Sequence, residues 1–215
     1  MNKFLELSPI ASKVLFIDDR SEDDSLALIM NVCRNDKRYS FISLEHNGGL
    51  SVALKAGIDH SDSTFIGYID SDLQTSPSDF LNLLPYSSDY ELVMGIRESR
   101  KDGWIKRLSS AIANGFRQWL LNDEIADTGC PLKIVNAQFA SNIIFFNGMH
   151  RFIPNLITIL GGRVKQVPVT HYPRMAGRPK YTLLNRLIGP LVDAVFVWWI
   201  QRNLIRYRVR TCNDK

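Results

Sequence analysis

Short apolar runs alternate with amphipathic stretches through the first half of the chain. A short apolar run bounded by turn residues predicts a buried strand, and apolar residues at intervals of three and four predict a helix. The predicted strands are 13–17, 39–44, 65–69 and 92–95, and the predicted helices are 25–33, 52–58 and 79–84. Strands that alternate with helices favour an α/β fold with a parallel sheet and right-handed crossovers.

The second half of the chain has longer amphipathic stretches. They predict helices at 104–121, 136–146 and 152–160, strands at 133–135 and 163–170, a basic loop at 173–180, and one or two amphipathic helices from 183 to about 207. We therefore expect one α/β domain over residues 1–182 and a C-terminal amphipathic, basic segment over residues 183–215.

Two carboxylates follow directly after the apolar run 65–69. A strand of a parallel sheet is covered on both faces and is therefore nearly continuous apolar sequence, and open α/β sheets bind ligands at its C-terminal end. On an extended segment, Asp70, Asp72 and Gln74 point to the same side. Their oxygens suit Mg²⁺ or Mn²⁺, which bind through one or two carboxylates and substrate phosphates. Taken alone, the motif favours this site and a solvated turn equally, because Asp, Ser and Pro are also turn formers.

Composition narrows the class of protein. With 215 residues, 45% of them hydrophobic and 22% charged, the chain can bury the core of one domain. A net charge of +4 is too small to indicate nucleic-acid binding, although arginines gather at positions 202, 206, 208 and 210. Cys33, Cys130 and Cys212 lack metal-ligand spacing, and the N-terminus lacks a basic and apolar leader. These features favour a cytoplasmic protein without a disulfide framework.

Several motifs together resemble the inverting nucleotide-sugar glycosyltransferases of the GT-A fold, in particular the polyprenyl-phosphate branch that includes dolichol-phosphate-mannose synthases. The motifs, in the family's order, are Ile17-Asp18-Asp19-Arg20-Ser21, Asn47-x-Gly49, Asp70-Ser71-Asp72-Leu73-Gln74, Gly95-x-Arg97-x-x-Arg100, Asp127-Thr128-Gly129-Cys130 and His171-x-Pro173-Arg174-x-x-Gly177-x-x-Lys180-Tyr181. Each motif is weak alone, and their joint order and spacing carry the resemblance. It implies a Rossmann-like sheet with flanking helices.

The resemblance also implies roles for individual residues. Nucleotide contacts are implied for Asp18, Asp19, Asn47, Gly49, Lys55, Asp70, Arg100 and Arg151, and contacts to Mg²⁺ or Mn²⁺ for Asp70, Asp72 and Gln74. Catalytic roles are implied for Asp70, Asp72, Arg97, Asp127, Arg174 and Lys180. The cationic residues suit the diphosphate or an acceptor phosphate, because guanidinium forks match phosphate oxygens.

Plainer interpretations stay open for several of these residues. Arg97 and Arg100 also fit a solvated charged loop, and Asp127 fits a turn or cap before Gly129. The residues expected in the core are Trp104, Phe116, Trp119 and Cys130.

Three features depart from the family pattern. Arg20 stands where the first acidic turn has glycine, and Pro179 stands where the family has serine before Lys-Tyr. The family's opening strand and helix do not precede Val14. We therefore expect an N-terminally shortened sheet with weak nucleotide binding, whose vacant position is filled by homo-oligomerisation or by another segment, or else a reading frame that begins upstream.

The expected activity is metal-dependent transfer of a sugar from a nucleotide-diphosphate sugar to a polyprenyl phosphate, for cell-envelope glycans or lipid glycosylation. Residues 187–200 are too short an apolar stretch to span a membrane, so we expect them to lie on the anionic inner face of the cell membrane. An ordinary core helix with a basic tail is the alternative for this segment. Two rival classes are a phospho-receiver module, with Asp18 and Asp19 as the acidic pair and Asp70 as phospho-acceptor, and a catalytically silent membrane-surface binding protein.

Overall fold

The computed structural model describes residues 1–97, 114–172 and 183–205. Several residues singled out from the sequence, among them Arg100, Trp104, Arg174, Pro179, Lys180 and the arginines after 205, lie outside the described residues. The three described segments contain all of the strands expected from the sequence.

Within residues 1–97, 114–172 and 183–205, six strands form two separate sheets. The smaller sheet pairs β1 (Val14–Asp18) with β2 (Tyr39–Ser43) in parallel. The larger sheet has the order β3-β5-β4-β6, with bounds Phe65–Tyr68, Lys133–Asn136, Leu92–Arg97 and Val164–Val169. The strand positions match the predicted ones within two residues at each end.

The expectation of a wholly parallel sheet is wrong at β5. This strand runs antiparallel to both β3 and β4, whereas β4 and β6 are parallel. The reason is the place where β5 begins. Asp127, just upstream of β5, is bonded to Arg97 at the end of β4, so the chain enters β5 at the edge where β4 ends and returns in the opposite direction.

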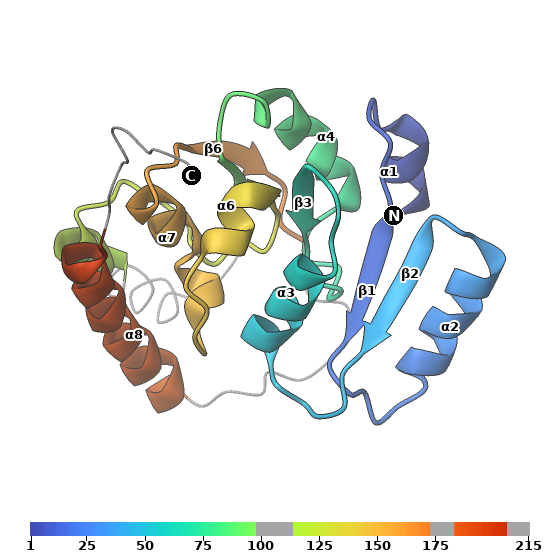
Figure 1. The fold of residues 1–215 in the computed structure, drawn as a ribbon, viewed down its shortest axis with the longest axis horizontal. Helices are drawn as coiled ribbons and strands as arrows, with labels where there is room; N and C mark the ends of the chain where they lie inside the picture. The colour runs from blue at the N-terminus through green and yellow to red at the C-terminus, as the bar shows by residue number, and fades with distance from the viewer. Residues whose placement is uncertain (98–113, 173–182, 206–215) are drawn as a thin grey trace, which may run out of the picture.

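The two sheets are separated between β1 and β3. Figure 1 shows the β1–β2 pair beside β3, with α3 (Leu50–Asp59) alongside both. Within the described segments, no strand pairs with the second edge of β1 or with the second edge of β3. All four residues of β3 are half-buried or exposed, which contradicts the expectation that this strand is covered on both faces.

The helices cover the two sheets (Figure 1). Besides α3 they are α1 (Asn2–Leu7), α2 (Ser25–Asn35), α4 (Phe80–Leu83) between the 3₁₀ turns η1 (Pro77–Asp79) and η2 (Leu84–Tyr86), α6 (Ala137–Asn142), η3 (Met149–Arg151), α7 (Ile153–Ile159) and α8 (Leu183–Asn203). Residues 114–121 are also helical. The helix predicted for 136–146 ends early, because Ile143 turns to an extended conformation after Asn142.

The main core lies between the larger sheet and the helices of the second half. One face of α8 contributes Ala194, Val197 and Ile200 to this core. The opposite face leaves Val192 and Trp199 more than half exposed, at 62% and 56%. Among the described residues, no helix is both long and apolar enough to cross a membrane.

Two expectations about single side chains can be compared with this core. Cys130 is fully buried, as expected, and Phe116 packs partly buried against the core. Trp119 is 77% exposed, so its predicted place in the core is wrong. The helical spacing that puts Phe116 inward turns Trp119, only three residues later, toward the edge of the packed face.

Candidate active site

The end of β1 carries an acidic turn that is built by hydrogen bonds. Asp18 is almost completely buried, and its carboxylate accepts from Ser43 Oγ at 2.7 Å and from the backbone N–H of Ser21 at 3.0 Å. The hydrogen bonds from Ser21 and then Ser43 hold the pKa of Asp18 below its usual value, although burial opposes them. Asp18 therefore stays ionised and fixes the turn that follows β1.

Asp19 joins this turn to the beginning of α3. Its two carboxylate oxygens accept from the backbone N–H groups of Gly48 at 2.7 Å and Gly49 at 2.8 Å. Asn47 donates back to the carbonyl oxygen of Asp19 at 2.9 Å. The four residues predicted to contact the nucleotide at this edge, Asp18, Asp19, Asn47 and Gly49, are thus brought together by the fold.

The backbone conformation at Arg20 shows why the resembled family has glycine at this position of the turn. Its φ angle is +57°, in the left-handed region that glycine adopts without strain. The arginine side chain donates to the carbonyl oxygen of Glu45 at 2.9 Å. That contact ties the acidic turn to the segment after β2 and partly offsets the backbone cost.

Asp70 and Asp72 follow β3 in a tight turn. Tyr68 donates its hydroxyl hydrogen to Asp70 Oδ1 at 2.7 Å, and Asp72 accepts the backbone N–H of Gln74 at 3.2 Å. Leu73 has a positive φ of 60°, so the segment is not extended. The expected alternation of Asp70, Asp72 and Gln74 along one side of a strand is therefore wrong, because a turn replaces the pleat.

The turn that carries Asp70 and Asp72 still fits a hard divalent cation. Among the described residues, no group of three or more His, Cys, Asp or Glu side chains is placed to enclose a metal ion. Mg²⁺ and Mn²⁺ do not require one, since they bind through one or two carboxylates together with substrate phosphates and water. The hydrogen bond from Tyr68 orients Asp70 from behind, as a partner outside the metal's own ligands commonly does.

A pocket of about 230 Å³ opens beside Asp70. Its walls come from the end of β3, the turn before β5, β5 itself and η3. The polar side chains that line it are Tyr68, Asp70, Thr128, Lys133, His150 and Arg151. The predicted residues Asp70 and Arg151 therefore share one cavity, although 81 positions separate them in the sequence numbering.

Lys133 is the pocket residue that sequence reasoning missed most clearly. Its side chain is 2% exposed, and it donates to the carbonyl oxygen of Cys130 and lies 5.6 Å from the centre of the Tyr68 ring. Burial lowers the pKa of Lys133 from 10.5 to about 8. A lysine within an apolar strand pattern was the available signal, because a strand covered on both faces rarely places a lysine in its interior.

His150 is a second missed residue of the pocket. Its Nδ1 lies 3.1 Å from Ser51 Oγ, which also accepts the backbone N–H of Gly148 at 3.1 Å. Burial, together with the neighbouring charges of Arg151 and Lys133, lowers the pKa of His150 from 6.5 to about 4. The imidazole is therefore neutral at pH 7, and its hydrogen bond with Ser51 links η3 to α3.

Arg97 and Asp127, both predicted catalytic residues, are paired with each other. Arg97 Nε lies 2.7 Å from Asp127 Oδ2, and Arg97 Nη2 lies 2.8 Å from Asp127 Oδ1. Asp127 also accepts the backbone N–H of Gly129 at 3.2 Å. The pair holds the Thr128–Pro131 turn, which is one wall of the pocket.

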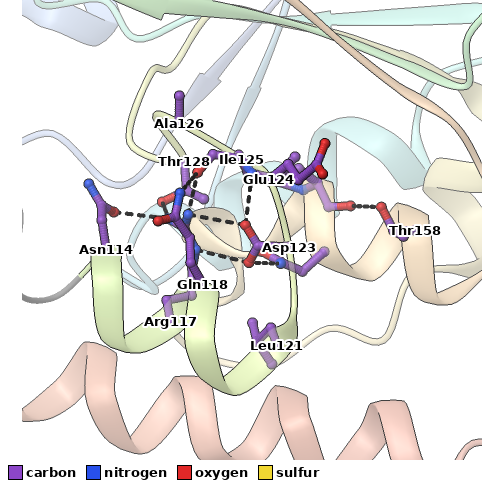
Figure 2. A network of polar contacts seen from close by, with 12 residues as sticks. Asn114, Arg117, Gln118, Leu121, Asp123, Glu124, Ile125, Ala126, Thr128 and Thr158 are labelled. Carbon is purple, nitrogen blue, oxygen red and sulfur yellow. Dashed lines mark hydrogen bonds and ion pairs between the residues drawn. The ribbon is translucent and has the colours of Figure 1, made fainter.

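The same turn is supported from the other side by a buried arginine. Figure 2 shows Arg117 at the centre of a polar network that joins the helix at 114–121 to the loop before β5. The guanidinium donates to Asp123, Asn114, Thr128 and the carbonyl oxygen of Ile125. Thr128 lines the pocket, so Arg117 acts on the site by positioning this loop.

The remaining predicted residues have partners nearby. Lys55 pairs with Asp59 one turn later on α3, and both side chains are about half exposed. Arg151 Nη1 lies 3.6 Å from Asp193 Oδ2 on α8. Burial raises the pKa of Asp193 despite the neighbouring arginine. Arg151 therefore faces both the pocket and α8, whereas Lys55 is engaged at the surface of α3.

The arrangement of the sheets and helices is similar to that of solved glycosyltransferase structures. Mannosyl-3-phosphoglycerate synthase from Rubrobacter xylanophilus is 15% identical, with a TM-score of 0.71, and the match covers 99% of this chain and 71% of that one. Glucosyl-3-phosphoglycerate synthase from Mycobacterium tuberculosis, in complex with Mn²⁺, UDP-glucose and phosphoglyceric acid, is 14% identical, with a TM-score of 0.66 and coverage of 96% and 73%.

The family follows from the sequence match. The model of glycosyl transferase family 2 matches residues 2–146, which is more than half of the chain. The chain therefore belongs to glycosyl transferase family 2. This membership confirms the glycosyltransferase class predicted from the motifs, and it excludes the phospho-receiver alternative.

Proposed function

We propose that this chain transfers a sugar from a nucleotide-diphosphate sugar to the phosphate of a polyprenyl phosphate at a membrane surface. The observation that carries the proposal is the pocket in which Asp70 shares a cavity with two cationic side chains, Lys133 and Arg151. A carboxylate at a strand end suits a metal-bound diphosphate, and cations beside it suit a second, anionic substrate.

The donor side of the site is the edge formed by the acidic turn after β1 and the acidic turn after β3. At the end of β1, Asp19 is joined to Asn47 and Gly49 by hydrogen bonds, and the neighbouring Asp18 is held by Ser43. We assign Asp18, Asp19, Asn47 and Gly49 to the base and ribose of the nucleotide. Asp70 and Asp72, with Gln74, would hold Mg²⁺ or Mn²⁺. When bound, such a metal acts as a Lewis acid that stabilises the diphosphate leaving group.

The acceptor side is cationic, and this fits a phosphate nucleophile. A phosphate oxygen is already anionic, so it needs no strong general base to remove a proton. Asp127 is tied to Arg97 by two hydrogen bonds, and together they hold the wall of the pocket in place. Arg100, Arg174 and Lys180, outside the described residues, remain predicted phosphate contacts.

The exposed face of α8 supports a lipid-linked acceptor. Val192, Val195, Phe196 and Trp199 form an exposed apolar stripe along this helix, and Arg202 lies over the ring of Trp198 at 4.9 Å near its end. Apolar side chains with flanking arginines are typical of helices that lie in the interface of an anionic membrane. Phe196 packs against Phe146, and Asp193 contacts Arg151, so this face adjoins the pocket.

The test is direct incubation of the protein with labelled sugar nucleotides, Mn²⁺ or Mg²⁺, and acceptors. One arm contains a polyprenyl phosphate in vesicles, and a second contains 3-phosphoglycerate, the acceptor class named for the two synthases described above. We expect metal-dependent formation of a sugar-linked polyprenyl phosphate. Transfer to 3-phosphoglycerate alone would contradict the lipid acceptor, and no turnover of any donor would support a catalytically silent binding protein.

A further inference from the structure

The ammonium group of Lys133 is buried, and the carboxylates of Asp70 and Asp127 act on its charge from beyond ion-pair distance. It donates to the carbonyl oxygen of Cys130 and lies over the face of the Tyr68 ring, and no carboxylate of the described residues lies within ion-pair distance of it. An ammonium carries three donor hydrogens, and a buried charge without a paired anion is costly. A group of this kind that lines a cavity supplies a site for an anion.

The other groups around the pocket define the charge that it accepts. Arg151 lines the same cavity, and its contact with Asp193 is loose at 3.6 Å, compared with 2.7 Å between Arg97 and Asp127. His150 is neutral at pH 7, because burial and the neighbouring cations lower its pKa. Burial also raises the pKa of the Cys130 thiol, which is therefore uncharged. Of the residues that the structure describes, Asp70 is the single acidic side chain that lines the pocket.

Two cations that line one cavity fit a monophosphate ester. Such an ester carries between one and two negative charges near pH 7 and presents three oxygens as acceptors. Arg151 offers a guanidinium fork for two of these oxygens, and Lys133 offers a point charge for another. Asp70, which lines the same cavity, is the carboxylate assigned to the metal and the donor diphosphate, so an anion bound by the two cations would lie near it.

We propose that Lys133 and Arg151 bind the phosphate monoester of the acceptor in this pocket, between the end of β3 and η3. The inference rests on the proposed function and adds the place and the residues that receive the acceptor. In the transfer step, an oxygen of this phosphate forms the new bond to the anomeric carbon. The bond from that carbon to the diphosphate oxygen breaks, and the nucleoside diphosphate leaves with the electron pair. No proton needs to move.

The central experiment replaces Lys133 with a neutral residue of similar length. Lys133→Met removes the buried charge and keeps the packing, so its melting temperature should equal or exceed that of the wild type. The KM for the acceptor should rise by about 10-fold or more, as expected for the loss of a hydrogen bond to a charged group, whereas the KM for the donor should not change. The matched control is Lys165→Met, because Lys165 also lies over a tyrosine ring, 5.1 Å from the centre of Tyr86, but does not line the pocket.

A second variant keeps the test valid if the first one misfolds. Arg151 is 35% exposed at its side chain, so Arg151→Met should leave the melting temperature unchanged within a few degrees and should also raise the KM for the acceptor. Inorganic phosphate should inhibit the wild type in competition with the acceptor and should inhibit both variants less. Calorimetric titration of farnesyl phosphate, 3-phosphoglycerate and inorganic phosphate then separates a lipid-linked source of the phosphate from a soluble one.

The outcomes separate this inference from the proposed function. Sugar transfer to polyprenyl phosphate with an unchanged acceptor KM in both variants would overturn the inference and leave the proposed function intact. A rise in the donor KM instead would assign the cations to the donor diphosphate and overturn the inference. If phosphate esters bind in a Lys133-dependent manner but no sugar reaches polyprenyl phosphate, the pocket assignment stands and the proposed acceptor falls.

Discussion

Arg97 and Asp127, 30 positions apart, form a two-point ion pair that joins the end of β4 to the turn before β5. Nε and Nη2 of the arginine lie 2.7 and 2.8 Å from the two carboxylate oxygens, and the backbone N–H of Arg97 lies 3.3 Å from Oδ2. Asp127 is 6% exposed. A planar guanidinium that binds both oxygens of a buried carboxylate fixes the orientation of the two groups and the distance between them. The pair therefore determines the position of the Thr128–Pro131 turn, which lines the pocket.

Breaking this pair should destabilise the protein. Asp127→Asn removes the negative charge that pairs with the Arg97 guanidinium, and loss of one partner from a largely buried pair costs about 3 kcal/mol of the free energy of unfolding. Urea denaturation measures the effect. The control is Asp36→Asn, because Asp36 pairs with Arg38 at the surface, where such pairs contribute little. Equal effects of the two substitutions would show that the Arg97–Asp127 pair contributes no more to the free energy of unfolding than a surface pair does.

Removing the second carboxylate after β3 should abolish turnover and spare the fold. Asp72→Asn is expected to lose metal-dependent sugar transfer, while its melting temperature stays within about 2 °C of the wild type, because Asp72 lies in the turn after β3, outside the buried core, and asparagine can still accept the N–H of Gln74. Asp62→Asn, at the exposed segment before β3, is the matched control. Wild-type activity in Asp72→Asn would show that the metal is bound elsewhere.

His150 should make stability depend on pH between about 6.5 and 4. Its pKa is lowered to about 4 in the folded protein from an ordinary value of 6.5, so the unfolded chain binds the proton more strongly. The stabilisation from the neutral imidazole is complete above pH 6.5 and is lost as the pH falls toward 4, with a slope of at most about 1.4 kcal/mol per pH unit.

The measurement is urea denaturation at pH 7, 6 and 5. His150→Gln should flatten the dependence over this interval, because glutamine does not titrate. His60→Gln, at the exposed end of α3, should leave it as in the wild type. A curve for His150→Gln that keeps the full slope would assign the pH dependence to other groups.

The outer face of α8 should bind anionic membranes. Trp199→Glu and Val192→Glu place charges on side chains that are 56% and 62% exposed, so they should lower sedimentation with anionic vesicles and leave folding intact. Val197→Glu is unsuitable as a test, because Val197 is fully buried in the core. Deleting the whole segment has the same defect, since Ala194 and Ile200 are buried with it. Unchanged vesicle binding by the double variant would favour the plain core helix.

The separation of the two sheets should be visible in hydrogen exchange. β4 is paired on both sides, with β5 and β6, and Leu92, Val93 and Met94 are fully buried. β1 and β3 each pair on one side within the described residues. We therefore expect part of the amides in 14–18 and 65–68 to exchange far faster than those of β4. Protection in β1 and β3 equal to that of β4 would indicate that their second edges are covered in solution.

The sequence by itself determined the local features of the site. The apolar runs predicted the positions of the strands. Asp18, Asp19, Asp70 and Asp72 stand at the ends of these runs, so the sequence also predicted that they lie at strand ends. The Asn-x-Gly segment marked the beginning of α3, where Gly49 has a φ of +78°. These features follow from the spacing of apolar side chains and from the preferences of turn residues. Both depend on neighbours along the chain, so they can be predicted without the tertiary structure.

Only the tertiary structure decided which distant groups meet. Lys133 and Tyr68 are opposed in the β3–β5 ladder, and that register buries a lysine against the pocket; Arg97 meets Asp127 because β5 runs antiparallel. Trp119 is exposed and Lys133 is buried, the reverse of what their chemistry favours alone. Strand pairing and burial depend on contacts between residues far apart in sequence, and periodicity carries no information about which of those contacts form.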